Sequence, residues 1–371
     1  MKIPLIKPYI DNSIKEKVLE VLDSGILTEG NVTREFENKF KDYIGTKYSI
    51  AVTSCTTGLE IALRAAGIGN GDEVIVPDFT YPATASVVNI VGAVPVIVDV
   101  SRETMLISYD DIEKAITPKT KAIIPVSIFG NPLDYNKLNK IKNNNGLIII
   151  EDAACSIGAE YFNKKVGTLA DISVFSLHPR KFITTGEGGL ITTDNENYAE
   201  WIQSYKHFGM NMNNENVREG ITFEIIGTNY KLSNVLSAIG LGQLNIINEL
   251  LMKRINLAEN YNEYLGKHSE IRIPSYETGA KHSYQSYCIY VEKRDKIMKI
   301  MRSNGIEVQI GTYSLHMHDA FRKNSKVKLA GNFDNSKYAY EHCLTLPLYH
   351  ELSFEQQEYI VKILIETINN I

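Results

Sequence analysis

The stretch Leu147-Ile148-Ile149-Ile150-Glu151-Asp152-Ala153-Ala154 joins a short apolar run to two carboxylates. A strand that is apolar on every residue is typical of a parallel sheet, because helices cover both faces of such a sheet. Ligands of open α/β sheets bind at the carboxyl ends of the strands, so this stretch predicts a strand that ends at a binding site, with Asp152 beside the ligand. On its own, this aspartate is more simply explained as a turn or N-cap residue.

Similar apolar runs recur on both sides of this stretch, separated by segments with a helical pattern. They are short and rich in Val and Ile, and they lie at residues 74–76, 94–98, 122–126, 172–175 and 190–192. One helix is predicted between Ser54 and Gly67, where apolar residues follow helical spacing between an N-cap and a C-terminal glycine. This alternation predicts βαβ units, and therefore an α/β fold with a mostly parallel sheet.

The pattern changes in the last third of the chain. A long helical stretch at 236–265 is followed by an alternating, half-exposed strand at 287–291 and then by an irregular mixture of helix and strand patterns. We therefore expect a large domain at 1–249 and a smaller α+β domain at 250–371, with the long helix as a bridge.

Composition excludes several classes of protein. The 371 residues carry a formal net charge of -5, so a general affinity for nucleic acid is not expected. The four cysteines lack the C-x-x-C spacing of zinc or iron–sulfur sites. Neither the apolar core of a signal peptide nor an apolar run of about 18 residues is present. We expect a cytoplasmic protein without a membrane span.

Two further stretches contain groups that can bind or react. Lys181 ends the sequence SLHPRK, and the glycine-rich run TTGEGG follows at 184–189 without the order of a nucleotide-binding P-loop. Ser54, Thr56 and Thr57 lie at the predicted helix start, where free N–H groups and the helix dipole favour an anion. Taken alone, the lysine is more simply an exposed charge before a turn, and the hydroxyls are more simply N-caps.

Together, the three features match the needs of pyridoxal 5′-phosphate (PLP). Its aldehyde forms an imine with a lysine amine, here Lys181. Its pyridine nitrogen stays protonated beside a carboxylate, here Asp152, which lets the ring accept electrons. Its phosphate carries nearly two negative charges, which a hydroxyl-rich helix N-terminus offsets. The sequence therefore predicts a PLP enzyme with Lys181 and Asp152 as catalytic residues.

Five ordered motifs carry a resemblance to a known family. They are GDEVIVP at 71–77, EDAA at 151–154, SLHPRK at 176–181, TTGEGG at 184–189 and NYKLS at 229–233. In this order they resemble the DegT/DnrJ/EryC1/StrS family of nucleotide-sugar aminotransferases over nearly the whole chain. The resemblance implies the aspartate aminotransferase fold. It also implies a ping-pong transfer of an amino group from glutamate or glutamine to a keto sugar nucleotide, for amino-sugar biosynthesis.

The resemblance also implies roles for single residues. Lys181 matches the lysine that binds PLP and shuttles the proton, and Asp152 matches the partner of the pyridine nitrogen. Tyr81 matches an aromatic that stacks on the ring. The residues that match phosphate ligands are Thr56, Thr57, Ser176 and Asn229. The neighbouring subunit donates the last of these, which implies a homodimer.

Some positions depart from the family pattern. Cys55 stands where glycine is frequent, Ser127 where histidine is frequent, and Lys231 where arginine is frequent. Cys155 replaces a glutamine that usually reaches the phenolic oxygen of the cofactor. Because a thiol is a weaker donor than an amide, Cys155 is a cofactor-binding candidate that would tune the ring differently.

The acceptor site is the least specified part of the sequence. Candidates for contacts to the acceptor are His178, Glu187, Arg218, Lys231, Tyr313, His316 and His318. A surface or structural role explains His316 equally well. His316, His318 and Asp319 also allow a metal site, but their spacing matches no standard one and the resembled family needs no metal. We therefore expect no metal.

Three alternatives remain on the same scaffold. A small phosphorylated ketone could replace the sugar nucleotide as acceptor. A PLP sugar dehydratase of the resembled family has histidine in place of the lysine, whereas Lys181 is present here. A non-catalytic PLP-binding regulator would need neither Lys181 nor Asp152 intact, and the chain shows no DNA-binding segment.

Overall fold

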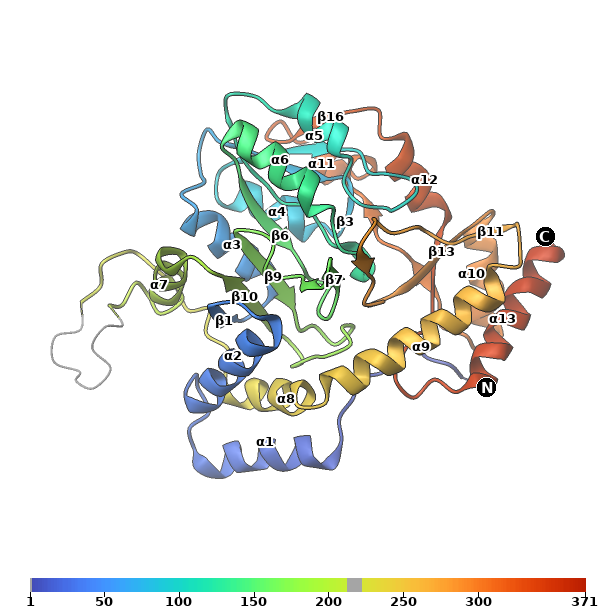
Figure 1. Cartoon of the computed structure of the whole chain (residues 1–371), viewed down its shortest axis with the longest axis horizontal. Coiled ribbons are helices and arrows are strands. Elements are labelled where there is room, and N and C mark those ends of the chain that lie inside the picture. The colour runs from blue at the N-terminus through green and yellow to red at the C-terminus, as the bar shows by residue number, and fades with distance from the viewer. Residues whose placement is uncertain (1, 212–221) are drawn as a thin grey trace.

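An eight-stranded sheet forms the centre of the computed structural model, which describes residues 2–211 and 222–371 (Figure 1). The strand order is β1-β10-β9-β6-β5-β2-β4-β16, and all neighbours are parallel except β1–β10 and β10–β9. The predicted α/β class is thereby confirmed. The strands are β1 (Tyr48–Val52), β2 (Glu73–Pro77), β4 (Val94–Val98), β5 (Thr120–Ile123), β6 (Ile148–Asp152), β9 (Ile172–Ser176), β10 (Gly189–Thr193) and β16 (Lys328–Ala330).

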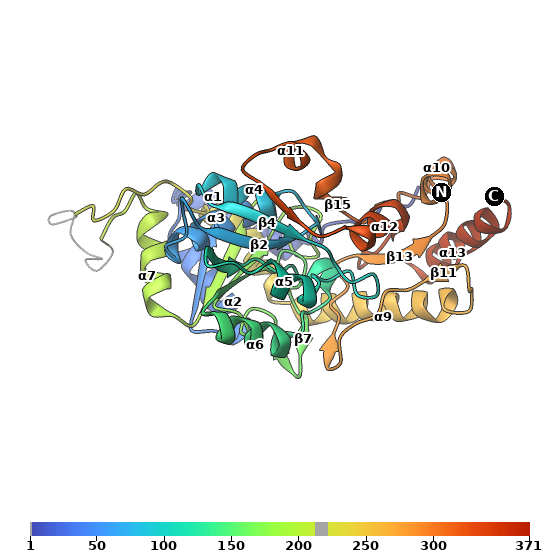
Figure 2. The ribbon, with the colours of Figure 1, turned by 90° about the horizontal axis from the view of Figure 1, so that it is seen from above.

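Helices cover both faces of this sheet, which explains why its strands are apolar on every residue. Figure 2 shows β2 and β4 between α4 on one side and α5 and α6 on the other. One face packs against α3 (Cys55–Ala65), α4 (Ala83–Ile90) and α7 (Glu196–Tyr205). The other packs against α2 (Asn31–Ile44), α5 (Tyr109–Ala115), α6 (Tyr135–Asn145) and α8 (Asn234–Leu244), and α1 (Asn12–Ser24) lies against α8.

Helix α3 begins where the sequence predicted it. Ser54 is its N-cap and accepts from Thr57 N at 3.1 Å, while Thr57 Oγ1 accepts from Ser54 N at 3.1 Å. This reciprocal capping box satisfies two N–H groups that the helix cannot pair internally. The chain leaves the helix through Gly67 in a left-handed conformation (φ 72°), which glycine adopts without a steric cost.

A smaller antiparallel sheet lies in the C-terminal part, in the order β11-β13-β17-β14. It packs against α9 (Ile247–Leu265), α10 (Arg294–Ser303) and α13 (Phe354–Asn369). Figure 1 shows α9 running from α8, below the large sheet, to α13 beside the small one. Its strands are β11 (Ile271–Arg272), β13 (Tyr287–Val291), β14 (Gln309–Ile310) and β17 (Cys343–Leu346). The remaining elements are β3 (Phe79–Thr80), β7 (Glu160–Tyr161), β8 (Lys164–Lys165), β12 (Ala280–Lys281), β15 (Tyr313–Ser314), α11 (Asp319–Arg322) and α12 (Asp334–His342).

The C-terminal part is interwoven with the large sheet. Strand β16 pairs in parallel with β4, and β15 pairs with β3. The predicted boundary after residue 249 falls within α9. The division into domains at 1–249 and 250–371 therefore stays a prediction.

The single helix predicted at 236–265 is wrong. The chain forms α8 and α9 instead, with a bend of 62° between them. Helix α8 packs within the core of the large sheet, whereas α9 follows the small sheet, and one straight helix cannot serve both cores. In the described part of the chain no single helix is long and apolar enough to cross a membrane, and only this bent pair meets those criteria jointly.

The strand predicted as half-exposed at 287–291 is also corrected. It is β13, and all five of its residues are buried. Cys288 and Tyr290 belong to the core of the large sheet, while Tyr287, Ile289 and Val291 belong to the core of the small sheet. Successive side chains of β13 therefore point in turn into the two cores, and not in turn into a core and into solvent.

Candidate active site

The carboxyl edge of the large sheet collects most of the predicted site residues. Helix α3 begins after β1, Tyr81 follows β2 and β3, and Asp152 and Ser176 are the last residues of β6 and β9. Lys181 lies in the loop after β9. Because β1, β2, β6 and β9 run in one direction, their ends meet at the same edge.

Asp152 is 5% exposed and lies on the α3 side of the sheet, with Oδ1 4.0 Å from Cys55 Sγ. Glu151, its neighbour in β6, points to the opposite face, as alternation along a strand requires. Thr84 Oγ1 donates to Asp152 Oδ2 at 2.8 Å, and Ala154 N donates to Oδ1 at 3.2 Å. Burial raises the pKa of Asp152, while these hydrogen bonds oppose the rise. Such a carboxylate favours a cation beside it.

Two buried glutamine side chains hold the loop that carries Lys181. Gln285 bonds the backbone on both sides of Lys181, donating to the preceding carbonyl at 2.7 Å and accepting from the following N–H at 3.0 Å. Gln243 of α8 bonds both backbone groups of Thr184, at 2.5 and 3.0 Å. Each amide satisfies backbone groups that have no strand partner, so the backbone position of Lys181 depends on α8 and on the C-terminal part.

The amine of Lys181 points to a thiol. Its Nζ lies 3.0 Å from Cys155 Sγ. Burial lowers the pKa of Lys181, but Cys155, Cys55 and Asp152 together outweigh burial and raise this pKa above its usual range. A lysine that acts as a base near neutral pH needs a lower pKa. A further cation in the pocket therefore has to lower the pKa of Lys181.

The start of α3 lies directly against β10, because Gly189 has no side chain. A Cβ at Gly189 would lie 2.7 Å from the backbone at the helix start. Gly189 pairs with Ser176, which places the end of β9 beside the same helix start. The Thr57 hydroxyl is engaged in the capping box, whereas no partner is recorded for the Thr56 hydroxyl among the described residues. This end of the site offers N–H groups and hydroxyls to an anion.

Two aromatic residues stand at the rim. Tyr81 is 65% exposed, and its ring centroid lies 6.2 Å from that of Tyr313, which β15 brings alongside β3. Buried Asp78 accepts from His316 N at 2.7 Å and from its Nδ1 at 2.6 Å. The His316 ring also stacks on Phe333 at 4.7 Å. Since Nδ1 is held by Asp78, Nε2 is the nitrogen left for a ligand.

Of the other predicted acceptor residues, His178 and Glu187 lie close enough for their charges to interact, and the ring of His318 lies 5.6 Å from that of Tyr313. His178 and Glu187 are exposed in the segments on either side of Lys181. Arg218 lies outside the described residues. Within residues 2–211 and 222–371, no group of three His, Cys, Asp or Glu side chains could hold a metal ion.

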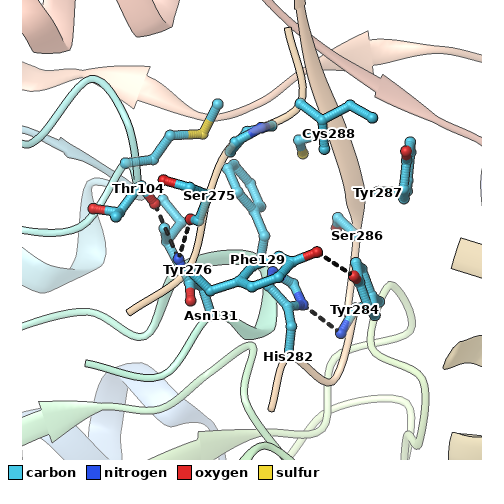
Figure 3. A pocket seen from close by; sticks show the side chains of 14 residues that line it. Thr104, Phe129, Asn131, Ser275, Tyr276, His282, Tyr284, Ser286, Tyr287 and Cys288 are labelled. Atoms are coloured by element: carbon cyan, nitrogen blue, oxygen red, sulfur yellow. Dashed lines mark hydrogen bonds between the residues drawn. The ribbon is translucent and has the colours of Figure 1, made fainter. Parts of the chain in front are cut away.

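A separate cavity lies between residues 128–131 and the segment 273–288 (Figure 3). Asn131 lines this cavity, and its side-chain amide donates to the carbonyls of Thr104 and Ser275, at 3.2 and 3.3 Å. The volume is about 30 Å³, which suits one or two water molecules and not a sugar nucleotide. No predicted catalytic residue lines it, so we expect substrates at the carboxyl edge of the large sheet.

The groups at this edge fit PLP. A buried carboxylate whose burial disfavours its charge suits a protonated pyridine nitrogen, the partly buried amine of Lys181 suits an aldehyde, and the α3 start suits a phosphate. Fold and site together therefore define a PLP-dependent transferase of the aspartate aminotransferase type.

The chain belongs to the DegT/DnrJ/EryC1/StrS aminotransferase family, whose model matches residues 8–365. It is 36% identical to the GDP-perosamine synthase of Caulobacter vibrioides over 85% of this chain and 86% of that protein. It is 31% identical to the spore coat polysaccharide biosynthesis protein SpsC of Bacillus subtilis, over 97% and 95%. The solved PLP form of Spr1654 from Streptococcus pneumoniae matches with a TM-score of 0.92 at 28% identity, over 100% and 99%. The chain is a PLP-dependent aminotransferase, which confirms the predicted family, fold, enzyme class and cofactor.

Sequence reasoning missed the residues that support the site. Thr84 donates to Asp152, and Gln243 and Gln285 bond the loop that carries Lys181. Asp78 binds His316. The sequence contained a signal for two of them. Gln243 interrupts an otherwise apolar helix, and Asp78 directly follows an apolar strand, as Asp152 ends one.

Replacement of Thr84 by valine tests the support of Asp152. Valine keeps the shape but removes the shortest of the hydrogen bonds to this buried carboxylate, and a bond to a charged group contributes about 1.5–3 kcal/mol. We expect PLP to bind about tenfold more weakly, measured by equilibrium dialysis. Thr84→Ser should retain wild-type affinity. Equal affinity of the wild type and Thr84→Val would show that the hydroxyl does not support the carboxylate.

Proposed function

We propose that this aminotransferase moves the amino group of glutamate or glutamine to a keto-deoxy sugar carried by a nucleotide. The chemistry is supported by the buried carboxylate of Asp152, which lies close enough to the amine of Lys181 for their charges to interact. The acceptor class is supported by the similarity to GDP-perosamine synthase. The product would serve surface polysaccharide or a glycosylated metabolite, in line with the name of the similar SpsC protein. A cytoplasmic location stays a prediction.

PLP supplies an aldehyde and an electron-accepting ring when bound. Different residues of the site would hold different parts of it. Lys181 would hold the aldehyde end and later move a proton with its amine. Asp152 would keep a proton on the far end of the ring. Thr56, Thr57 and Ser176 would hold the phosphate at the start of α3. Tyr81, exposed at the rim, would cover the ring.

The acceptor would bind at the rim. Tyr313 stands beside Tyr81, and the Asp78 contact leaves His316 Nε2 free to meet a hydroxyl or phosphate oxygen. His178 and Glu187 flank the lysine loop on its exposed side. Cys155 would lie beside the phenolic oxygen of the cofactor, next to the amine of Lys181.

We also propose a homodimer in which Asn229 reaches the phosphate of the neighbouring subunit. Asn229 is exposed, and Lys231 Nζ donates to its Oδ1 at 2.6 Å, so its Nδ2 faces away from the lysine as a donor. Large apolar side chains are also exposed just before this region, at Phe223 and Ile226, and in the N-terminal segment, at Leu19 and Ile26. Exposed apolar groups of this size favour a protein partner.

The first test is the half-reaction. Glutamate added to the PLP-loaded enzyme should convert its absorbance to that of the aminated cofactor, and borohydride should fix the cofactor on Lys181. Lys181→Ala should lose amine exchange by at least about 10³-fold, because the base and the covalent anchor are both removed. Undiminished exchange in this variant would refute the assignment. A PLP-binding regulator would bind the cofactor and show no conversion with glutamate.

The second test concerns the acceptor. The aminated enzyme is offered 3-keto and 4-keto nucleotide sugars beside small ketone phosphates, and the return of PLP absorbance is followed. We expect return only with a nucleotide sugar. Return with ketone phosphates alone would assign the alternative acceptor on the same scaffold. Loss of water from the sugar without consumption of an amine would indicate a dehydratase.

Mixed dimers test the role of Asn229. Lys181→Ala and Asn229→Asp homodimers should each be inactive, the second because an added negative charge repels the phosphate. If Asn229 acts across the interface, a heterodimer of the two variants has one intact site and should recover about half of the wild-type activity per dimer. Tyr230 O accepts from Thr53 N within one chain, which places this segment beside its own α3 as well. A lack of recovery would therefore assign Asn229 to its own subunit.

A further inference from the structure

The side chain nearest to the Lys181 amine is one that can itself carry a proton. Cys155 lies three residues after Asp152, the last residue of β6, and its Sγ is 3.0 Å from Lys181 Nζ. Among the described residues this is the one hydrogen bond recorded for that amine. Cys155 is partly exposed, whereas Cys55, Cys288 and Cys343 are buried.

An amine and a thiol at contact distance have two forms, an ammonium with a thiolate and an amine with a thiol. In water the usual pKa values of about 10.4 and about 8.5 favour the charged form by roughly a hundredfold. Burial opposes this form, because both charges lose water. Asp152 and Cys55 favour the ammonium form of Lys181, because a negative charge nearby stabilises a cation. Burial and the neighbouring groups therefore act in opposite directions on the proton of Lys181.

We propose that Cys155 is the proton partner of Lys181 and that the two side chains share one proton. When the proton moves, an N–H bond of the ammonium breaks, an S–H bond forms, and both charges are discharged. The lysine is then a free amine, as attack on an aldehyde or acceptance of a substrate proton requires. No oxidant or further reactant takes part. An amide at position 155 could donate a hydrogen bond but could not take the proton.

The inference rests on the proposed function only for its catalytic consequence. The pairing itself is a property of the two side chains and exists without any substrate. Cys55 offers an internal comparison, because it is a second thiol in the same pocket but contacts Asp152 and the Val174 carbonyl, not the amine.

Thiolate absorbance in the ultraviolet tests the pairing in the PLP-free protein. The titration of Cys155 is obtained by subtracting the curve of Cys155→Ala from that of the full set of thiols. Lys181→Met should move the midpoint upward by about one to two pH units, because the ammonium partner is lost. Lys181→Arg should give the same curve as the wild type, since its charge is permanent. An equal midpoint in the wild type and in Lys181→Met would overturn the proposal.

The pH profile of amine exchange tests the consequence. Cys155→Ser should slow exchange with glutamate by about tenfold near neutral pH and shift the optimum to higher pH, because a serine hydroxyl cannot take the proton there. Cys288→Ser, in the buried strand β13, should leave the profile unchanged. A wild-type profile in Cys155→Ser would overturn the catalytic role. If the wild type shows no exchange at all, the proposed function fails, while the thiolate titration still decides the pairing.

Discussion

A buried carboxylate is costly when no cation hydrogen-bonds to it, and in the described part of the chain Asp152 is such a group. Its donors, the Thr84 hydroxyl, the Ala154 N–H and, at 4.0 Å, the Cys55 thiol, are neutral, and burial pushes its pKa upward. A structure keeps such a site when a ligand supplies the missing charge. In the role proposed for Asp152, the protonated ring of PLP would supply that charge. The amine of Lys181 would then hold the aldehyde end of the cofactor, and the start of α3 would hold its phosphate.

The sheet topology makes this arrangement possible, and distant side chains make it rigid. Strands β1, β2, β6 and β9 end at one edge, so the helix start, the carboxylate and the lysine loop meet there. The lysine loop itself has no regular secondary structure. Gln243 from α8 and Gln285 from the C-terminal part satisfy its backbone groups, so the position of this loop depends on both of these parts of the chain.

The local pattern was enough to predict the strands of the large sheet and the α3 cap, because these follow from period and capping. The parallel order of the strands also predicts that Asp152 lies at the carboxyl edge of the sheet. The local pattern was not enough for contacts between distant positions. Thr84 lies 68 residues from Asp152, and Gln285 lies 103 residues from Phe182. The bend after α8 also follows from tertiary packing, because the helical period continues through residues 236–265 while the two cores lie in different directions. The acceptor candidates were chosen by residue type, and of these the structure gives defined hydrogen-bond partners to His316 and Lys231 and leaves His178 and Glu187 exposed.

Glutamate and the sugar nucleotide, two of the proposed substrates, are both anions and would use the site in turn. The site therefore has to attract both. Glutamate presents carboxylates, and a sugar nucleotide presents a diphosphate. The chain has a net charge of -5, so attraction cannot come from the protein as a whole and has to come from cations at the rim. Arg180 is exposed and tied to Gln309 at 3.0 Å, and Lys231 is tied to Asn229. Charges placed this way can serve one anion after the other, since neither forms an ion pair with a carboxylate in the described chain.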